Sequence, residues 1–299
     1  AASDVYKRQA YTYNIVENSQ YLPTSVWANG QAYKGTKKRE SLLGNMMLTY
    51  KKNWKKHFFD VLALAELQKE TYTGYYTTVS NFSTDKFGYN NLQAGALRLW
   101  EGTNSYYEQP RLASFMGRFN YTYADRYVLT LNARTDASSK FGANHKWGFF
   151  PSASAAWVIS EEEFMKQFPV IDNLKFRIGY GLAGNNRIGS YQSLALMSSV
   201  TAANGNGAQA GYASRQVPNP DLKWEANKTF NIGMDFGFLN QRITFSPEFY
   251  INRSSNLLLN AKLPNSSGYT SMVINAGETQ NTGVDLTINT ANIVSKDFT

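Results

Sequence analysis

The chain has 299 residues, no cysteine, only two histidines and a formal net charge of +8, so a disulfide scaffold and any thiolate nucleophile or metal site are excluded. Charged residues make up 17% of the chain and aromatic residues 15%, a balance that suits strands with one apolar and one polar face. The basic cluster Lys51, Lys52, Lys55 and Lys56 lacks the extended basic surface that nucleic-acid binding requires.

Residues 1–9 share no pattern with the rest of the chain, and we predict that they are a non-native or unrelated leader to a single domain over 10–299. Residues 42–50 and 58–67 are strand-like and are separated by a tight turn at 51–56. No stretch approaches the ~20 apolar residues that a membrane-spanning helix needs. The sequence also stops in mid-pattern at 293–299, so we expect it to be truncated at both ends.

Strict alternation of apolar and polar residues dominates the rest of the chain. The alternating segments are 113–123, 127–134, 174–181, 230–238, 243–252 and 284–289. They reach the ~9–11 residues of a tilted membrane strand, whereas soluble strands average ~5–6. Pro247 lies on the apolar face of its segment and predicts a local bulge. An aromatic apolar face opposite a polar face predicts strands that separate lipid from a wet lumen.

The connections alternate between short and long. Short ones lie at 51–56, 123–126 and 238–242, and long polar ones lie near 81–109, 136–146, 184–220 and 254–281. This pattern predicts an all-β, antiparallel transmembrane barrel with short periplasmic turns and long extracellular loops. Trp54 and Trp157 near short turns, and Trp100, Trp147 and Trp224 near long loops, are candidates for interfacial girdles. Ordinary core packing is the alternative for each.

One short periplasmic turn helix is expected near 160–168, where Ser160 and Glu163 have capping-box spacing. The adjacent acids Glu161, Glu162 and Glu163 suit a helix N-terminus.

Motifs for chemistry are weak. Residues 179–184 spell GxGxxG, but a loop follows instead of the helix that dinucleotide binding needs. His57 and His145 have no ligand partners at metal spacing. Asp136 or Asp235 could pair with Glu225 as a glycosidase would, although no pattern pairs them. We predict no catalytic residue, metal site or cofactor.

Several ordered segments resemble one family. Residues 134–142 resemble R-x-D-G-S-S-x-F-G with Ala137 in place of Gly, residues 147–152 with Trp157 resemble WGxFPS…W, and residues 174–185 resemble LKxRxxYGxxGN. Residues 219–225 resemble NPxLxWE, and residues 275–286 resemble NxG…NxGxE with Asp285 in place of Glu. The family in question is the SusC/RagA-like TonB-dependent outer-membrane transporters. The matched motif positions, expected to be structural, are Ser138, Ser139, Phe141, Gly142, Phe150, Pro151, Ser152, Trp157, Gly181, Asn185, Asn219, Pro220, Trp224, Glu225, Asn281, Gly283 and Asp285.

The resemblance implies part of a barrel of ~22 strands with a plugged lumen. It further implies TonB-dependent uptake of an oligosaccharide or peptide nutrient across the bacterial outer membrane, without bond chemistry. The implied partners are a SusD-like surface lipoprotein, the TonB complex, the lipid bilayer and the substrate. The family's plug, its TonB box and a closing strand lie outside this sequence, and the TonB complex would act through that N-terminal part.

Candidate ligand contacts are lumen-facing charges and loop tyrosines, with lumen salt bridges or loop packing as the alternative. They are Arg118, Arg134, Asp136, Lys175, Arg177, Tyr106, Tyr107, Tyr191 and Tyr212. Three other functions remain open at this point. They are a siderophore or cobalamin receptor of the same barrel class, a soluble all-β carbohydrate-binding or glycosidase domain, and an adhesive or structural barrel without a plug.

Overall fold

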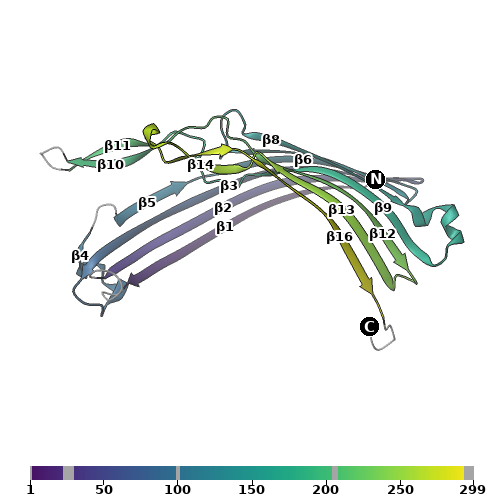
Figure 1. Cartoon of the computed structure of the whole chain (residues 1–299), viewed down its shortest axis with the longest axis horizontal. Coiled ribbons are helices and arrows are strands. Elements are labelled where there is room, and N and C mark those ends of the chain that lie inside the picture. Colours follow the sequence, from purple (N-terminus) through teal and green to yellow (C-terminus); the bar gives the residue numbers. More distant parts are fainter. Residues whose placement is uncertain (1, 23–29, 99–101, 204–207, 293–299) are drawn as a thin grey trace. The chain divides into compact units, whose positions relative to one another are not determined.

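The computed structural model describes residues 2–22, 30–98, 102–203 and 208–292. Within these residues a 12-stranded sheet runs in the order β1-β2-β3-β6-β7-β8-β9-β12-β13-β16, with β4 and β5 both paired to β3. Apart from β4 and β5, successive strands of the sheet are neighbours in chain order (Figure 1). The main strands are β1 (Ala2–Leu22), β2 (Gln31–Trp54), β3 (His57–Phe82), β6 (Arg111–Tyr123), β7 (Tyr127–Ser138), β8 (Trp147–Val158), β9 (Ile171–Asn185), β12 (Glu225–Phe238), β13 (Ile243–Ser255) and β16 (Glu278–Thr290).

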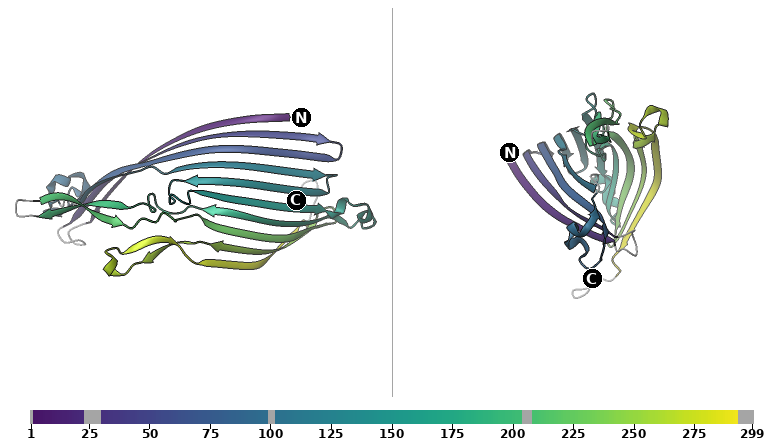
Figure 2. Two further views of the ribbon diagram at one scale, coloured as in Figure 1. Left: turned by 90° about the horizontal axis from the view of Figure 1, so that it is seen from above. Right: turned by 90° about the vertical axis from the view of Figure 1, so that its left-hand side faces the viewer.

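The chain divides into two compact units. Unit 1 comprises residues 1–7, 46–66 and 113–299, and unit 2 comprises residues 8–45 and 67–112. Unit 1 carries most of the antiparallel meander, including the pairs β7–β8, β8–β9, β9–β12, β12–β13 and β13–β16. Two small hairpins, β10–β11 (Leu196–Ala203 and Ala208–Gln216) and β14–β15 (Leu258–Lys262 and Ser271–Asn275), belong to unit 1 as well. They project from the end of the meander opposite the short helices η4 and η5 (Figure 2).

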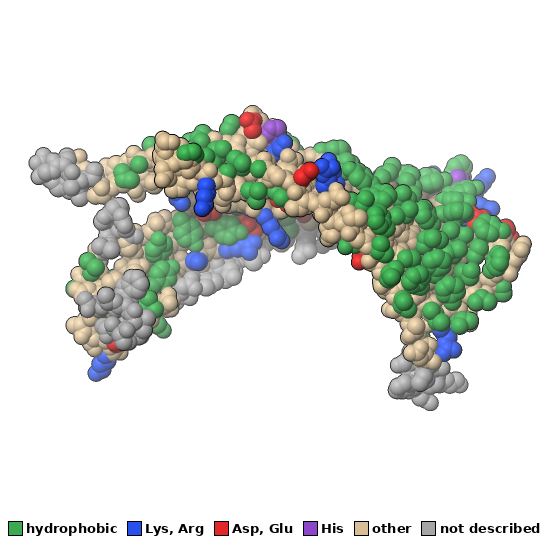
Figure 3. All heavy atoms as spheres, viewed as in Figure 1, with side chains coloured by type: hydrophobic (Ala, Val, Ile, Leu, Met, Phe, Trp, Pro, Cys, Tyr) green, Lys and Arg blue, Asp and Glu red, His purple; other side chains and the backbone are tan. Residues whose placement is uncertain are grey.

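The meander of unit 1 has the two faces that the alternation predicts. Large apolar side chains alternate along each strand and stay exposed, as in β7 and β16; the exposed set includes Leu129, Leu131, Val284, Leu286 and Ile288. Figure 3 shows hydrophobic side chains gathered over the part of this sheet that lies beside η4 and η5. Because soluble monomers rarely expose such broad apolar surfaces, this face suits hydrocarbon.

Unit 2 contains the remaining parts of β1, β2 and β3 with β4 (Gly95–Leu97), β5 (Thr103–Glu108) and the 3-10 turns η1 (Gly88–Asn90) and η2 (Leu92–Ala94). Its small core is formed by Ala32, Val79 and Phe82, with Tyr21 and Leu92 packed against it. The Tyr21 and Phe82 rings meet edge to face at 5.6 Å, a favourable aromatic geometry.

The short helix lies where it was expected, but its construction differs from the prediction. Two 3-10 helices, η4 (Ile159–Glu161) and η5 (Glu163–Gln167), replace one capped helix. Ser160 lies inside η4, and Glu162 precedes η5 in an extended conformation with no side-chain capping hydrogen bond. Glu162 binds the barrel rim instead, through its side-chain carboxylate, and its extended backbone separates the two turns.

The bulge expected at Pro247 is wrong. Pro247 pairs with Leu286 in an unbroken β13–β16 register. On the other side, Gly233 pairs with Glu248 and Phe236 with Phe245, so β12 and β13 keep the same register across the proline. A bulge would insert one extra residue into the strand. Here Pro247 removes one backbone N–H donor, and the register of the strand pairs does not change.

β1 begins at Ala2, so the backbone of the first nine residues continues into this strand. The leader boundary at residue 9 stays a prediction. The tight turns between β2 and β3, β6 and β7, and β12 and β13 are confirmed, with left-handed backbone at Lys55, Ala124, Asp125 and Leu239.

Candidate functional site

The polar face of unit 1 carries a first ion-pair cluster on β6 and β7. The Arg134 Nε donates to both carboxylate oxygens of Asp136, at 3.0 and 2.8 Å. A terminal nitrogen of Arg134 donates to the Ser114 hydroxyl at 3.1 Å. Asp136 and Ser114 are buried, and hydrogen bonds that satisfy buried charges are what make such burial tolerable.

A second cluster bridges three strands. The Arg177 Nε on β9 donates to Asp235 on β12 at 3.2 and 3.3 Å. The same guanidinium also donates through Nη1 to Glu248 on β13, and Glu248 accepts from the Asn231 amide at 3.2 Å. One cation therefore holds two carboxylates together, and Arg177 depends on both partners for its position.

Two further candidate cations differ from these pairs. Lys175 stands opposite Asp235 in the β9–β12 register. With Arg177, Ser154 and Asn231 it lines a hollow of about 320 Å³. Arg118 is half-buried on β6, and its Nε has no hydrogen-bond partner among the described residues.

The candidate tyrosines do not gather beside these charges. Tyr191 lies in the loop between β9 and β10, and Tyr212 is 77% exposed on the β10–β11 hairpin. Tyr106 and Tyr107 lie on β5 of unit 2. The nine predicted contacts are thus spread over several places. Of the charges among them, Arg134 and Asp136 bind each other, and Arg177 binds Asp235 and Glu248, which were not predicted contacts.

The family-motif positions, in contrast, meet at one place in unit 1, which we call the motif junction: Phe141, Gly142, Phe150, Pro220, Leu222 and Trp224. The Trp224 ring lies 4.7 Å from that of Phe141 and 5.5 Å from that of Phe150. Its indole nitrogen donates to the Lys146 carbonyl at 3.0 Å. Phe141 and Leu222 are almost fully buried, so two segments far apart in sequence, 141–150 and 220–224, share a core.

Gly142 and Gly184 allow this close packing. The Gly142 amide donates to the Leu222 carbonyl at 3.0 Å, and an added Cβ at Gly142 would lie 2.0 Å from the Pro220 oxygen. An added Cβ at Gly184 would lie 2.1 Å from the Phe150 ring. The GxGxxG run therefore lies within strand β9, where its last glycine makes room for an aromatic ring.

Amide side chains extend the junction to the neighbouring hairpin. Asn219 donates to the Val273 carbonyl at 2.9 Å. Asn275 accepts from the Lys223 amide at 2.9 Å and donates to its carbonyl at 2.8 Å. Glu225 accepts from the Asn185 side-chain amide at 3.1 Å and from the Leu258 backbone amide at 3.4 Å, so it joins β12 to β9 and to the start of β14.

The remaining motif positions lie along the strands. Ser138 is buried and its amide donates to the Lys146 carbonyl at 3.0 Å, while Ser139 is exposed. Ser152 accepts from Asn132 at 3.1 Å and stands opposite Gly181, and Pro151 pairs with Ala133. Asn281, Gly283 and Asp285 on β16 face Asn252, Tyr250 and Glu248 on β13.

At the short-turn end, aromatic rings follow one another across five neighbouring strand ends, those of β2, β3, β6, β7 and β8. The centre of the His57 ring lies 5.5 Å from that of the Trp54 ring and 4.9 Å from that of the Tyr123 ring. Tyr127 continues the series at 6.3 Å from Tyr123 and 6.4 Å from Trp157. This aromatic rim agrees with the expected girdle for Trp54 and Trp157.

Glu162 binds this rim. Its carboxylate accepts from the Tyr127 hydroxyl at 2.6 Å, from the Trp157 indole at 3.1 Å and from Arg126 at 2.9 Å. The hydrogen bond from Tyr127, then that from Trp157, lowers the pKa of Glu162 below its ordinary value. This role was not predicted from the sequence, because the run of three acids suited a helix N-terminus.

Trp147 is exposed, which agrees with a place in the opposite girdle. Trp224 is buried in the motif junction, so of its two alternatives core packing applies and a place in a girdle does not. The Trp100 candidate lies outside the described residues.

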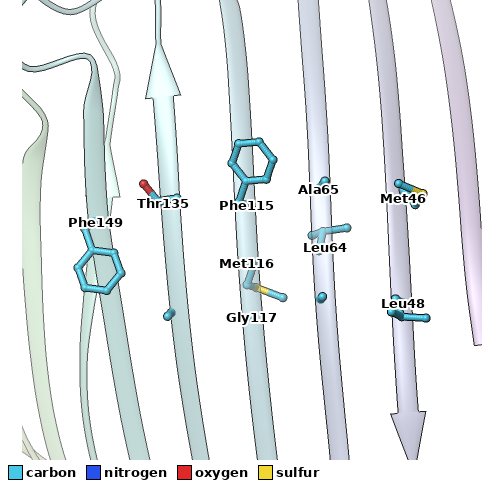
Figure 4. A pocket seen from close by; sticks show the side chains of 11 residues that line it. Met46, Leu48, Leu64, Ala65, Phe115, Met116, Gly117, Thr135 and Phe149 are labelled. Carbon is cyan, nitrogen blue, oxygen red and sulfur yellow. The ribbon is translucent and has the colours of Figure 1, made fainter. Parts of the chain in front are cut away.

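A groove of about 590 Å³ lies on the apolar face of unit 1. Met46, Leu48, Phe115 and Phe149 form its large walls, and small residues such as Gly117 form its floor (Figure 4). Its lining is almost wholly apolar, so it suits a hydrocarbon chain and offers a hydrophilic substrate no hydrogen bonds.

Across the described ranges, no helix has the length and apolar character needed to cross a membrane. In the same part of the chain, no group of three or more histidine, aspartate or glutamate side chains is placed to hold a metal ion.

Comparisons with known proteins agree with this geometry. The family described as "TonB dependent receptor-like, beta-barrel" matches residues 2–298. TonB-dependent receptor P3 of Formosa agariphila is 35% identical over 290 residues, covering 95% of this chain and 29% of that protein. TonB-dependent receptor SusC of Bacteroides thetaiotaomicron is 33% identical over 308 residues, covering 95% of this chain and 28% of that protein.

The fold matches the structure titled as that of the RagAB peptide transporter, with a TM-score of 0.85 at 24% identity. The match covers 98% of this chain and 33% of that one. The chain therefore spans less than a third of the curated relatives named above. The all-β antiparallel fold, the aromatic rim and the matches along nearly the whole sequence lead to one conclusion: the chain belongs to the TonB-dependent receptor-like β-barrel family of the bacterial outer membrane.

Proposed function

We propose that the chain forms part of the wall of a transporter that takes up an oligosaccharide or peptide nutrient across the bacterial outer membrane, driven through TonB. The observation that carries this is the two-faced meander of unit 1. One face exposes apolar side chains, and the other carries the Arg134–Asp136 and Arg177–Asp235–Glu248 clusters. A wall between lipid and a wet lumen needs this division.

Names of relatives support TonB-dependent uptake and one of the two substrate classes, a peptide. SusC is a TonB-dependent receptor, and the RagAB structure is titled as that of a peptide transporter. By analogy with these proteins, the partners of this chain are a SusD-like surface lipoprotein and the TonB complex, together with the bilayer. Nucleic acid is not among them.

The mechanism is binding and gated passage without bond chemistry, so no enzyme activity and no cofactor are part of the proposal. Arg118, Arg134, Asp136, Lys175 and Arg177 are proposed lumen contacts. Lys175 and Arg118 are the stronger candidates of this set. Arg134 and Arg177 already hold their carboxylates, whereas no ion pair within the described residues involves Lys175 or Arg118.

The alternatives have less support. A siderophore or cobalamin receptor would share the barrel, but the FPS and NPxLxWE segments that build the motif junction match the SusC-like pattern. A soluble carbohydrate-binding domain would bury its apolar face, whereas Val284, Leu286 and Ile288 are each more than 60% exposed. An adhesive or structural barrel without a plug remains a distinct outcome of the experiment below.

The test is to express the complete gene product that contains this sequence in a bacterium with an outer membrane, together with a SusD-like partner, and to measure its location and uptake. We expect a heat-modifiable band that only detergent extracts, and uptake that stops when TonB is deleted. A soluble product would contradict the barrel. A membrane barrel that takes up nothing with or without TonB would support the adhesive alternative.

A further inference from the structure

Unit 2 carries four tyrosines on one face of β2, β3 and β5, which we call the tyrosine face: Tyr33, Tyr72, Tyr76 and Tyr106. The Tyr33 and Tyr76 rings lie 5.6 Å apart. Tyr72, Gly74 and Tyr76 alternate along β3 and so point to the same side, and β5 places Tyr106 directly opposite Gly74. Aromatic side chains from three strands therefore form one surface.

Gly74 determines how Tyr106 lies on that surface. A Cβ added at Gly74 would approach the Tyr106 ring at 2.6–2.7 Å, so the ring covers the bare backbone. Gly35 on β2 likewise leaves room for Tyr33 and Tyr76, at 2.9 and 2.8 Å from a Cβ added there. Tyr106 is still 38% exposed. The rings thus form a platform with one open side.

Polar groups stand beside the platform in a fixed arrangement. Glu70 accepts from Arg39 at 2.5 Å and from the Tyr72 hydroxyl at 2.5 Å. The Arg39 guanidinium carbon lies 5.5 Å from the Tyr72 ring centre, within cation–π range. The Arg39 side chain is 55% exposed, and a guanidinium has five N–H donors, more than Glu70 accepts. The Arg39–Glu70 ion pair carries no net charge.

The strands that carry this face are longer than one membrane crossing requires. β2 has 24 residues and β3 has 26, whereas a tilted transmembrane strand needs only ~9–11. Both strands therefore have residues to spare beyond a single crossing.

We propose that the tyrosine face is a binding surface for a neutral oligosaccharide, captured outside the membrane. Tyr106 stacks on an apolar face of a sugar ring, and the exposed donors of Arg39 bind its hydroxyls. The inference rests on the proposed uptake function and narrows its substrate class.

Two features favour a sugar over a peptide. Flat aromatic surface beside charged donors and acceptors complements a ring that has apolar C–H faces and a hydroxyl rim. The paired charge of Arg39 and Glu70 gives no net attraction to a charged ligand. In addition, β5 meets β3 over Tyr72–Thr77, so a peptide could not add a strand to β3 at that place.

The experiment is calorimetric titration of the detergent-purified protein with maltoheptaose, cellohexaose, xylohexaose, mannohexaose and an uncharged octapeptide of alanine and serine. At least one oligosaccharide should bind, with little dependence on salt. Tyr106→Ala should weaken that binding at least tenfold and Tyr106→Phe less than twofold. Gly74→Ala keeps the Tyr106 ring but adds a methyl group beneath it that displaces the ring. This variant should weaken binding at least fivefold.

Tyr75→Ala is the matched control, because Tyr75 is 61% exposed and alternates to the opposite side of β3. It should leave binding within twofold of the parent. Parent-like binding by Tyr106→Ala, binding of the peptide alone, or no binding of any oligosaccharide would each overturn the inference. Heat-modifiable migration of every variant, measured in parallel, distinguishes these results from failure of the barrel itself.

Discussion

The two ends of the unit 1 meander are built in different ways. At the short-turn end, the aromatic rim and Glu162 join residues on neighbouring strands of the sheet and on the turns beside them, such as Tyr127 and Trp157. At the loop end, the motif junction joins Gly142 to Leu222 and Trp224 to Lys146. Contacts of the first kind follow from strand order alone, and those of the second kind require long loops to return to one place.

This difference predicts that one added methyl group destabilises the protein most in the motif junction. Gly142→Ala brings a Cβ within 2.0 Å of the Pro220 backbone oxygen, and neither backbone can yield without breaking the Gly142–Leu222 hydrogen bond. We expect a loss of roughly 3 kcal/mol, the upper part of the usual range for overpacking. Urea unfolding of the protein in detergent, followed by tryptophan fluorescence, measures it.

Gly117→Ala is the control for this change. Gly117 lies on the apolar face, and nothing lies within 4 Å of a Cβ added there. Its unfolding midpoint should match that of the parent. Equal behaviour of Gly142→Ala and Gly117→Ala would show that the motif junction does not support the loop end.

A smaller loss of stability is expected on the polar face of unit 1, between the two ends of the meander. Arg177→Ala leaves Asp235 and Glu248 without their shared cation, and we expect about 2 kcal/mol of destabilisation, because the cluster is only partly screened by solvent. The triple variant Arg177→Met, Asp235→Asn, Glu248→Gln removes all three charges and should recover most of this. If the triple variant is as unstable as the single one, like-charge repulsion is not the cause.

The smallest effect is expected at the aromatic rim. Glu162→Gln weakens the acceptor for Tyr127, Trp157 and Arg126. Because folding lowers the pKa of Glu162, its contribution is present above the ordinary carboxyl pKa and is lost as the pH falls through the lowered value. The variant should therefore unfold slightly earlier than the parent at pH 7 and together with it in strong acid, as measured by fluorescence.

Glu163→Gln serves as the comparison at the rim. The Glu163 and Lys166 side chains are 73% and 70% exposed, and exposed pairs of this kind contribute little. A Glu163→Gln effect as large as that of Glu162→Gln would show that the rim gains nothing specific from Glu162.

The two ends also differ in how much of their structure could be predicted from the sequence. Alternation identified the strands, their two faces and the tight turns, because side-chain direction in a strand depends only on neighbours in sequence. The sequence left Trp224 open between a girdle and the core, because its burial depends on Phe141 and Phe150, which reach it through loop closure. Pro247 was misread because register depends on both neighbouring strands. The tyrosine face escaped notice because its rings come from three strands whose pairing the pattern does not specify.

The pairing of charges on the polar face of unit 1 affects the electric field that a passing solute meets. Two arginines there lie against their own carboxylates, at 2.8 Å for Arg134 and Asp136 and 3.2 Å for Arg177 and Asp235. The Arg134–Asp136 pair acts as a dipole, whose field decays faster with distance than that of an isolated charge, and salt screens what remains within ~10 Å. Arg177, Asp235 and Glu248 together carry one excess negative charge, and Lys175 stands opposite Asp235 in the neighbouring strand. A solute that drifts along this wall would sense neither a cationic nor an anionic corridor until it touches a side chain. Where these clusters line it, an open passage would discriminate by contact chemistry, with little preference between small cations and anions.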